Sequence, residues 1–430
     1  MPIAIAIFAG ALALIASERV DRTKVALLGG VLVLLTQTID EQRALAAIEF
    51  NALGLLAGMM IVVRLTETTG VYSYIAVRAG QLSRGRPFAL VVALATATVV
   101  LSAFLDNLTT ILLLVPITFL LADEFAIDAR PLILIEIMAC NIGGAGTLIG
   151  DPPNIMIGSA TGLTFNDFAI ALTPVIVVVF VATMIPLYYV WGRHLRATEE
   201  NRRHVMSFNE NEAITDSRLL KQSLAVIALV IAGFMLQRQT GIEPATTAIF
   251  GAAVLLLLDN LGKDSETQSK NVHGALSEAE WITLMFFLGL FILVFGVQKA
   301  GLINLLADAL LKATGGDFNV TALAILWASA ILSAFIDNIP FVATMIPLIK
   351  AMGPSLGGDA ALLPLWWALS LGACLGGNGT LIGASANLVV AGLAERAGTT
   401  FRFVEFLKVA FPLMLISIVI SHAYLYLRYL

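Results

Sequence analysis

The sequence predicts an all-α polytopic membrane protein made of two inverted-topology repeats. Of its 430 residues, 59% are hydrophobic and 13% are charged, whereas soluble domains carry about 25% charge. Many apolar segments are long enough to cross a hydrocarbon core of about 30 Å. An unusual motif also occurs twice, as SAFLDNLTTILLLVPI at 102–117 and as SAFIDNIPFVATMIPL at 333–348. A repeated motif of this kind predicts two related halves with a site between them.

The halves share one register. Gly, Asp, Asn and Pro do not interchange freely in apolar sequence, so their recurrence at fixed separations indicates a repeat. Pairs 231 positions apart are Gly58/Gly289, Gly70/Gly301, Asp106/Asp337 and Pro116/Pro347; pairs 233 positions apart are Gly143/Gly376, Thr147/Thr380 and Asn154/Asn387. We therefore expect a first repeat at 1–192, a linker at 193–221 and a second repeat at 222–430.

Simple membrane spans account for most of each repeat. Apolar runs predict spans at 2–17, 23–38, 50–69 and 167–192 in the first repeat, and at 222–237, 244–260, 280–299 and 404–428 in the second. The polar stretch from Arg193 to Lys221 reads as a solvated linker.

Two further segments, 87–121 and 319–351, predict re-entrant hairpins. The only charged residue between Phe88 and Ala122 is Asp106, and the second hairpin has only Asp337 before its last residues. A loop that reached water would carry more polar residues. We therefore expect each tip to lie at membrane depth, where irregular backbone must be covered by protein or by a water-filled cavity.

The segments 131–158 and 361–394 predict broken helices. Both are interrupted by GTLIG, which is followed by DPPN in the first copy and by ASAN in the second. Glycine permits unusual backbone angles and proline removes an amide donor. The unwound backbone of a broken helix can coordinate ions and polar substrates.

Each half then has five crossings, and this odd number requires inverted halves. If the linker is cytoplasmic, 18 of the 25 basic residues lie inside and 6 outside, in keeping with the positive-inside rule. We expect an inner or plasma membrane protein with both termini outside.

The Asp-Asn pairs are the first candidate site. A lone carboxylate at membrane depth is costly, and it therefore indicates function. Asp106, Asn107, Asp337 and Asn338 offer oxygen ligands suited to sodium, and a desolvated aspartate can instead hold a proton. We expect both aspartates to face one central cavity. The alternative is that each tip only caps two helix ends.

Other polar residues of the hairpins and broken helices are further candidates. The alternative for them is a small-residue packing seam with satisfied polar side chains. Asp151 is replaced by Ala384 in the second repeat, so the two sites are unequal. The additional candidates for binding substrate or ion are Thr109, Gly146, Thr147, Asp151, Asn154, Asn378, Gly379, Thr380 and Asn387.

Single charges inside other segments have two readings. Glu136 could relay protons or could extend to the cytoplasmic face. Arg64 and Glu67, three residues apart on one span, are expected to neutralise each other. The four histidines show no metal spacing, and neither a catalytic triad, a phosphate loop nor a basic nucleic-acid stripe is present in the sequence. It does not predict an enzyme, a nucleic-acid partner or a cofactor beyond a sodium ion or proton.

FLDNLTTILLLVPI and NIGGAGTLIGDPPNIMIGSATGLTFNDF resemble the ion transporter superfamily, especially its arsenite-permease, sodium/proton antiporter and P-protein branch, which is related to citrate and dicarboxylate carriers. In dicarboxylate carriers the hairpin tip typically reads Ser-Asn-Thr, where this chain has Asp106-Asn107-Leu108. The extra carboxylates favour coupling to a cation or a proton. The resemblance implies an elevator mechanism and a homodimer in the lipid bilayer, and it leaves a cytoplasmic ATPase partner open.

The expected activity is ion-coupled secondary transport. We expect export of a small inorganic anion or oxyacid, of arsenite or antimonite type, in exchange with protons or sodium. The alternatives are a sodium/proton antiporter without an anion substrate and an anion channel.

Overall fold

The computed structural model describes residues 2–17, 19–84, 86–206, 209–277 and 279–430. These residues form helices and turns, with no β-strand among them. Eight of the described helices are long and apolar enough to cross a membrane. This architecture confirms the predicted all-α membrane fold.

Among its described residues, the first half contains ten α-helices, and α10 continues into one π-helical turn, Tyr188–Gly192. Their bounds are α1 (Pro2–Ser17), α2 (Arg22–Leu35), α3 (Glu41–Ala46), α4 (Phe50–Glu67), α5 (Val71–Leu82), α6 (Pro87–Ser102), α7 (Asn107–Glu124), α8 (Ala129–Gly144), α9 (Pro152–Thr161) and α10 (Phe165–Leu187). The predicted hairpin is α6–α7, and the predicted broken helix is α8–α9.

The linker contributes α11 (Glu199–Met206), and the rest of the chain repeats the pattern of the first half. Its α-helices are α12 (Ser217–Met235), α13 (Gln237–Thr240), α14 (Pro244–Asn260), α15 (Ser265–Ser277), α16 (Trp281–Lys299), α17 (Leu302–Ala313), α18 (Phe318–Phe335), α19 (Asn338–Met352), α20 (Leu363–Gly376), α21 (Ser385–Arg396) and α22 (Phe403–Arg428). The second hairpin is α18–α19, and the second broken helix is α20–α21.

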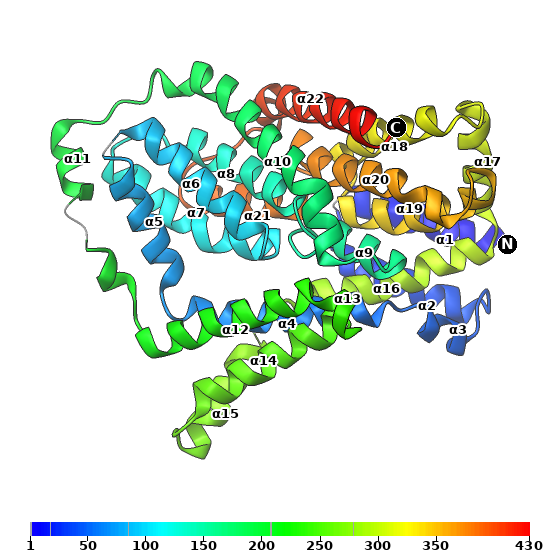
Figure 1. Cartoon of the computed structure of the whole chain (residues 1–430), viewed down its shortest axis with the longest axis horizontal. Helices are drawn as coiled ribbons and strands as arrows, with labels where there is room; N and C mark the ends of the chain where they lie inside the picture. The colour runs from blue at the N-terminus through cyan, green and yellow to red at the C-terminus, as the bar shows by residue number, and fades with distance from the viewer. Residues whose placement is uncertain (1, 18, 85, 207–208, 278) are drawn as a thin grey trace.

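The helices form two layers (Figure 1). One contains α1, α2, α4, α12, α14 and α16, which contact one another; α2, α4, α12, α14 and α16 follow the lower side of the view. We call it the crossing layer. The other contains the hairpins, the broken helices, α10 and α22, and we call it the hairpin layer. Helix α19 packs against α16, and α9 against α4, so the layers meet along these helices.

The crossing layer is joined by two equivalent glycine contacts. A Cβ atom on Gly58 of α4 would lie 2.6 Å from the carbonyl carbon of Ala248 on α14. A Cβ atom on Gly289 of α16 would lie 2.6 Å from the carbonyl carbon of Ala26 on α2. Small residues let helix backbones approach closely in membranes. The repeat pair Gly58/Gly289 therefore fixes two matching contacts, each between helices of different halves.

Alanine at Gly289 is expected to lower the stability of the folded protein by about 1–3 kcal/mol, the usual cost of overpacking, because α2 and α16 must move apart. Gly58→Ala should act in the same way on α4 and α14. Thermal unfolding in detergent measures both effects, with Gly10→Ala as the control because nothing lies within 4 Å of a Cβ there. An unfolding midpoint as high in Gly289→Ala as in Gly10→Ala would contradict this account.

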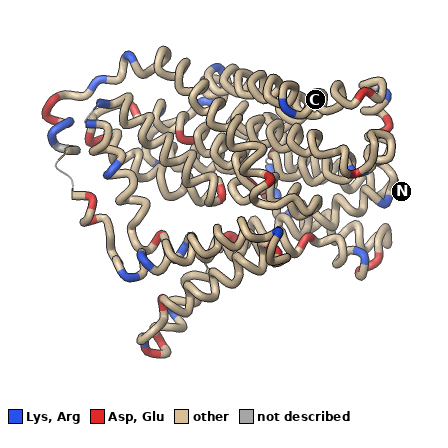
Figure 2. Tube along the Cα trace, viewed as in Figure 1, with Lys and Arg blue, Asp and Glu red and all other residues tan. Residues whose placement is uncertain are grey.

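The linker lies against α5. The backbone N–H of Thr215 donates to the carbonyl of Thr69 at 3.0 Å, and Arg78 pairs with Glu210 at 3.1 Å. Figure 2 shows Lys, Arg, Asp and Glu concentrated in this linker and near helix ends, with few of them along the central helices.

Candidate functional site

Each hairpin tip is an aspartate that caps the following helix. In the first tip, Asp106 accepts hydrogen bonds from the backbone N–H groups of Leu108 and Thr109 at 3.0 and 3.1 Å, and from the Thr109 hydroxyl at 2.5 Å. These bonds satisfy donors at the start of α7, as an N-cap does. The capping role anticipated as an alternative is therefore present, and it accounts for the placement of Thr109.

The second tip differs at one position. Asp337 accepts from the backbone N–H of Ile339 at 3.0 Å, but Pro340 stands where the first tip has Thr109 and offers neither donor. The second carboxylate oxygen of Asp337 instead pairs with Arg22 at 2.5 Å and accepts from the Ser385 hydroxyl at 2.7 Å.

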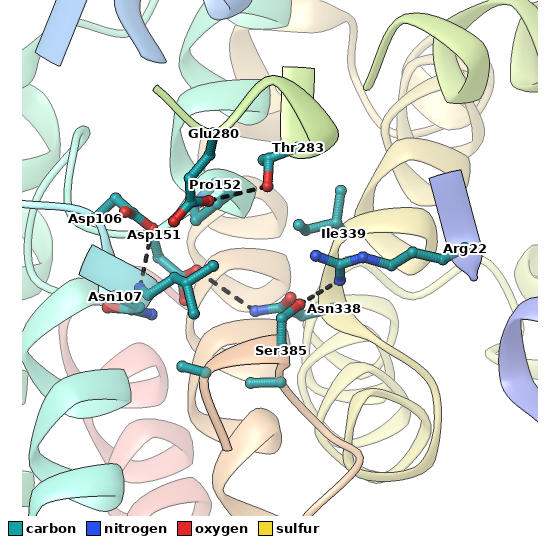
Figure 3. A pocket seen from close by; sticks show the side chains of 13 residues that line it. Arg22, Asp106, Asn107, Asp151, Pro152, Glu280, Thr283, Asn338, Ile339 and Ser385 are labelled. Carbon is teal, nitrogen blue, oxygen red and sulfur yellow. Dashed lines mark hydrogen bonds between the residues drawn. The ribbon is translucent and has the colours of Figure 1, made fainter. Parts of the chain in front are cut away.

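Between the tips lies a central cavity of about 30 Å³ (Figure 3). One water needs roughly 10–15 Å³ measured in this way, so the cavity has room for a small ion or about two waters. Its polar lining residues are Arg22, Asp106, Asn107, Asp151, Glu280, Thr283, Asn338 and Ser385. The shared cavity expected for both aspartates is found for Asp106, whereas Asp337 turns to Arg22 and lines a neighbouring cavity.

Asp151 is the most isolated carboxylate of this cavity. It precedes α9 at the break of the first broken helix, yet its side chain caps no backbone N–H. The residue is 2% exposed. One carboxylate oxygen lies 3.5 Å from the amide of Asn338 in the second hairpin, and the thiol of Cys374 is also close to the carboxylate. The other oxygen makes no hydrogen bond of normal geometry with the described residues. Residues of both halves thus meet at Asp151.

Two charged lining residues, Arg22 and Glu280, were not predicted from the sequence. Both come from the crossing layer, because α2 begins at Arg22 and α16 follows Glu280 directly. Thr283 donates to Glu280 at 3.1 Å, and the guanidinium of Arg22 lies 4.9 Å from the centre of the Phe286 ring. The available sequence signal was a charge at the first turn of an otherwise apolar span, which is indistinguishable from an ordinary loop charge.

Buried asparagines connect the two halves behind the cavity. The amide of Asn141 on α8 donates to the side-chain oxygens of Asn378 and Asn387 at 3.0 and 3.1 Å, and Asn107 donates to Asn141 at 3.4 Å. Asn141 was not among the predicted site residues. Its counterpart in the second repeat is Cys374, whose sulfur lies 3.7 Å from the side-chain oxygen of Asn154. Asn141 of the first half therefore contacts asparagines of the second half, and Cys374 of the second half contacts Asn154 of the first.

Other candidates hold backbone and do not line the cavity. The Thr147 hydroxyl donates to the Ala103 carbonyl at the first tip. Asn154 donates to the Thr147 carbonyl at 2.8 Å, and the Gly146 carbonyl accepts from Thr173 at 3.0 Å. In the second half, Thr380 donates to Ala334, Asn387 donates to the Thr380 carbonyl at 2.9 Å, and Gly379 packs where a Cβ would lie 2.7 Å from that of Ala334. The two threonines fasten each broken helix to its own hairpin, and the two asparagines hold the unwound backbone of the broken helices.

Three further charged residues singled out in the sequence lie outside the central cavity. Glu136 on α8 is 1% exposed and accepts from the Thr118 hydroxyl at 2.6 Å. The predicted ion pair between Arg64 and Glu67 is present at 2.5 Å. No group of three or more His, Cys, Asp or Glu in the described chain has metal-binding geometry. The four residues of the suggested sodium site are also divided, since Asp337 faces Arg22.

Hairpins and broken helices that meet at a polar cavity, packed against a layer of apolar crossing helices, define a polytopic membrane transporter. The chain belongs to the citrate transporter (CitMHS) family, whose sequence profile matches residues 12–372.

Relatives agree with this assignment and with the predicted superfamily. An uncharacterized transporter of Mycobacterium tuberculosis is 42% identical over 99% of this chain and 98% of its own length. The human P protein is 35% identical over 98% of this chain, which spans 59% of that longer protein. The crystal structure of the Alcanivorax borkumensis YdaH transporter aligns with a TM-score of 0.59 at 17% identity, covering 99% of this chain and 97% of that one. At this identity, the likeness shows the fold alone.

Proposed function

We propose that the chain is an ion-coupled secondary active transporter that exports a small inorganic anion or oxyacid, of arsenite or antimonite type, in exchange with protons or sodium. The observation that carries the proposal is Asp151, a buried carboxylate with one unpartnered oxygen between two hairpin tips. A carboxylate in such a place costs several kcal/mol unless it is protonated, paired or bound to a cation. An exchangeable proton or sodium ion supplies that partner.

The size and charge of the cavity support a small solute. About 30 Å³ suits an ion or a compact oxyacid better than a tricarboxylate. Asp106, Asp151 and Glu280 would also repel a polyanion, and Arg22 is the only basic side chain among the described lining residues. A neutral trihydroxy acid such as arsenious acid can instead donate hydrogen bonds to these carboxylates.

The two layers suggest how transport proceeds. The broken helices are tied to their hairpins by the hydroxyls of Thr147 and Thr380, so the hairpin layer is suited to move as one body against the crossing layer. This is the elevator motion that the superfamily resemblance implies. It would carry the site across the membrane in a homodimer of the inner or plasma membrane.

The second candidate is a sodium/proton antiporter without an anion substrate. Three carboxylates around one small cavity favour it, because they can bind sodium and protons in turn.

Flux in proteoliposomes separates these functions. With an outward-directed solute gradient, arsenite or citrate efflux is measured by mass spectrometry under an imposed proton or sodium gradient, with protein-free vesicles as the control. We expect gradient-dependent arsenite flux and no citrate flux. Sodium-driven proton flux without arsenite, unchanged by adding it, would establish the antiporter. Citrate flux without arsenite flux would overturn the proposed substrate class.

A further inference from the structure

A single ion pair separates the central cavity from a larger one. Arg22 and Ser385 line both cavities, and Asp337 lines the larger cavity of about 350 Å³. Arg22 and Asp337 are 2.5 Å apart, with side chains 23% and 12% exposed. The Ser385 hydroxyl donates to the same oxygen of Asp337 at 2.7 Å. The Arg22–Asp337 ion pair therefore lies between the central cavity and the larger cavity and separates them.

This pair is absent from the equivalent place in the first half. Counted from the repeat contacts Ala26/Ala248 and Gly29/Gly251, Arg22 corresponds to Pro244, and Ser385 corresponds to Pro152. Asp106 is satisfied within its own tip, and no basic side chain pairs with it in the described chain. The second half thus replaces local donors to the aspartate with an arginine from the crossing layer.

The environment of Arg22 is suited to exchanging one anion for another. Its guanidinium is placed over the Phe286 ring, and it has five N–H donors, of which one nitrogen serves Asp337 and Ser385. The only other charged residue of the larger cavity in the described lining, Asp21, accepts from the backbone N–H groups of Thr23 and Lys24 at the start of α2. Arg22 is therefore the one described basic group that a solute in this cavity can pair with.

We infer that Arg22 is an anion-binding residue and that Asp337 is an internal competitor for it: a single carboxylate or oxyanion group entering the larger cavity pairs with Arg22 and releases Asp337. A volume of about 350 Å³ lies in the range of ligand pockets, roughly 300–1,000 Å³. The inference rests on the proposed function and adds to it an anion subsite beside the central cavity, which keeps Asp151 and the coupling ion. Once released, Asp337 keeps its bonds to Ile339 and Ser385.

Binding without any ion gradient tests this inference apart from transport. Radiolabelled inorganic phosphate and radiolabelled citrate are each titrated onto purified protein in maltoside detergent. Arg22→Gln should weaken binding of the anion that the wild type takes by about tenfold or more, because a charge-assisted pair is lost. Asp337→Asn should strengthen it about tenfold, because the competitor is gone while asparagine still caps α19. Effects of opposite sign are not expected of an ion pair that only stabilises the fold.

The matched control is the Arg64–Glu67 pair, which has the same 2.5 Å separation and lies on one span. Arg64→Gln and Glu67→Gln should leave anion affinity within about twofold, as expected for sites outside the contact. Equal affinities in Arg22→Gln, Asp337→Asn and wild type would overturn the inference, and so would weaker binding in Asp337→Asn. Failure of every variant to bind either probe would do the same.

The phosphate of a lipid headgroup has the same chemistry as free phosphate. A second binding experiment, with a short-chain phosphatidate as the probe, distinguishes the two sources. We expect free phosphate or citrate to bind in phospholipid-free detergent. Binding of a short-chain phosphatidate alone would overturn the assignment to a soluble anion. Absence of arsenite flux together with Arg22-dependent anion binding would reject the proposed substrate and keep the inference.

Discussion

Replacement of Asp151 by asparagine is expected to remove the dependence of transport on the coupling-ion gradient and to slow flux about tenfold or more. The reason is that an unpaired carboxylate at membrane depth costs several kcal/mol, and a bound proton or sodium ion relieves that cost. Asparagine has nearly the same shape but can neither release a proton nor bind sodium as a carboxylate does. Because the side chain caps no backbone N–H, the fold should survive. Solute flux in proteoliposomes over a range of pH and sodium concentration measures the effect.

The matched control is Asp128→Asn. Asp128 precedes α8 as Asp151 precedes α9, but it caps Arg130 and is half exposed. Its replacement should leave both the rate and the pH profile unchanged. Ala384→Asp should not transfer the property to the second half, because the prolines after Asp151 are absent there. If Asp151→Asn transports with the wild-type pH profile, Asp151 has no part in coupling and the main support for the proposed function is lost.

The elements of the fold could be predicted because long apolar runs and a duplicated register constrain them strongly. The predicted span 244–260 matches α14, and the first hairpin ends at Glu124 instead of residue 121. Helices α5 and α17 were not predicted, because they are short and each follows a glycine, Gly70 or Gly301, whose positive φ angle changes the chain direction. How the two halves are oriented in a membrane stays a prediction.

The candidate site was predictable only within each motif. Arg22 and Asp337 are 315 residues apart, and no local pattern pairs them. Asn141, the first residue of the quoted segment NIGGAGTLIG, was missed because its repeat partner is Cys374 and no duplicated polar residue marks it. Conversely, Thr147 was expected to bind the solute. Its hydroxyl instead donates to a backbone carbonyl at the first hairpin tip, where the irregular backbone leaves carbonyl groups without helical partners. Buried carbonyls must be hydrogen-bonded, and the Thr147 hydroxyl meets that need.

Alanine at Asn107 or at Asn338 is expected to reduce transport about ten- to hundredfold, the equivalent of leaving one buried polar partner unsatisfied. Both amides line the central cavity. Asn338 donates to Asp151 at 3.5 Å from the other half of the chain, so its loss should also shift the dependence on the coupling ion. Asn107 accepts from Ser102 at 2.5 Å, and this hydroxyl keeps the Cys140 carbonyl as an acceptor, so Asn107→Ala should lower the rate without that shift.

Both variants should remain folded, because the apolar arms of the hairpins and their aspartate caps are unchanged. Size-exclusion elution in detergent measures folded protein, and flux in proteoliposomes is then normalised to it. Asn319→Ala is the control, since Asn319 belongs to the same hairpin as Asn338 but is exposed at the far end of α18. Near-normal flux in both tip variants would mean that the tips serve only as helix caps, and the solute site would then have to lie elsewhere than between them.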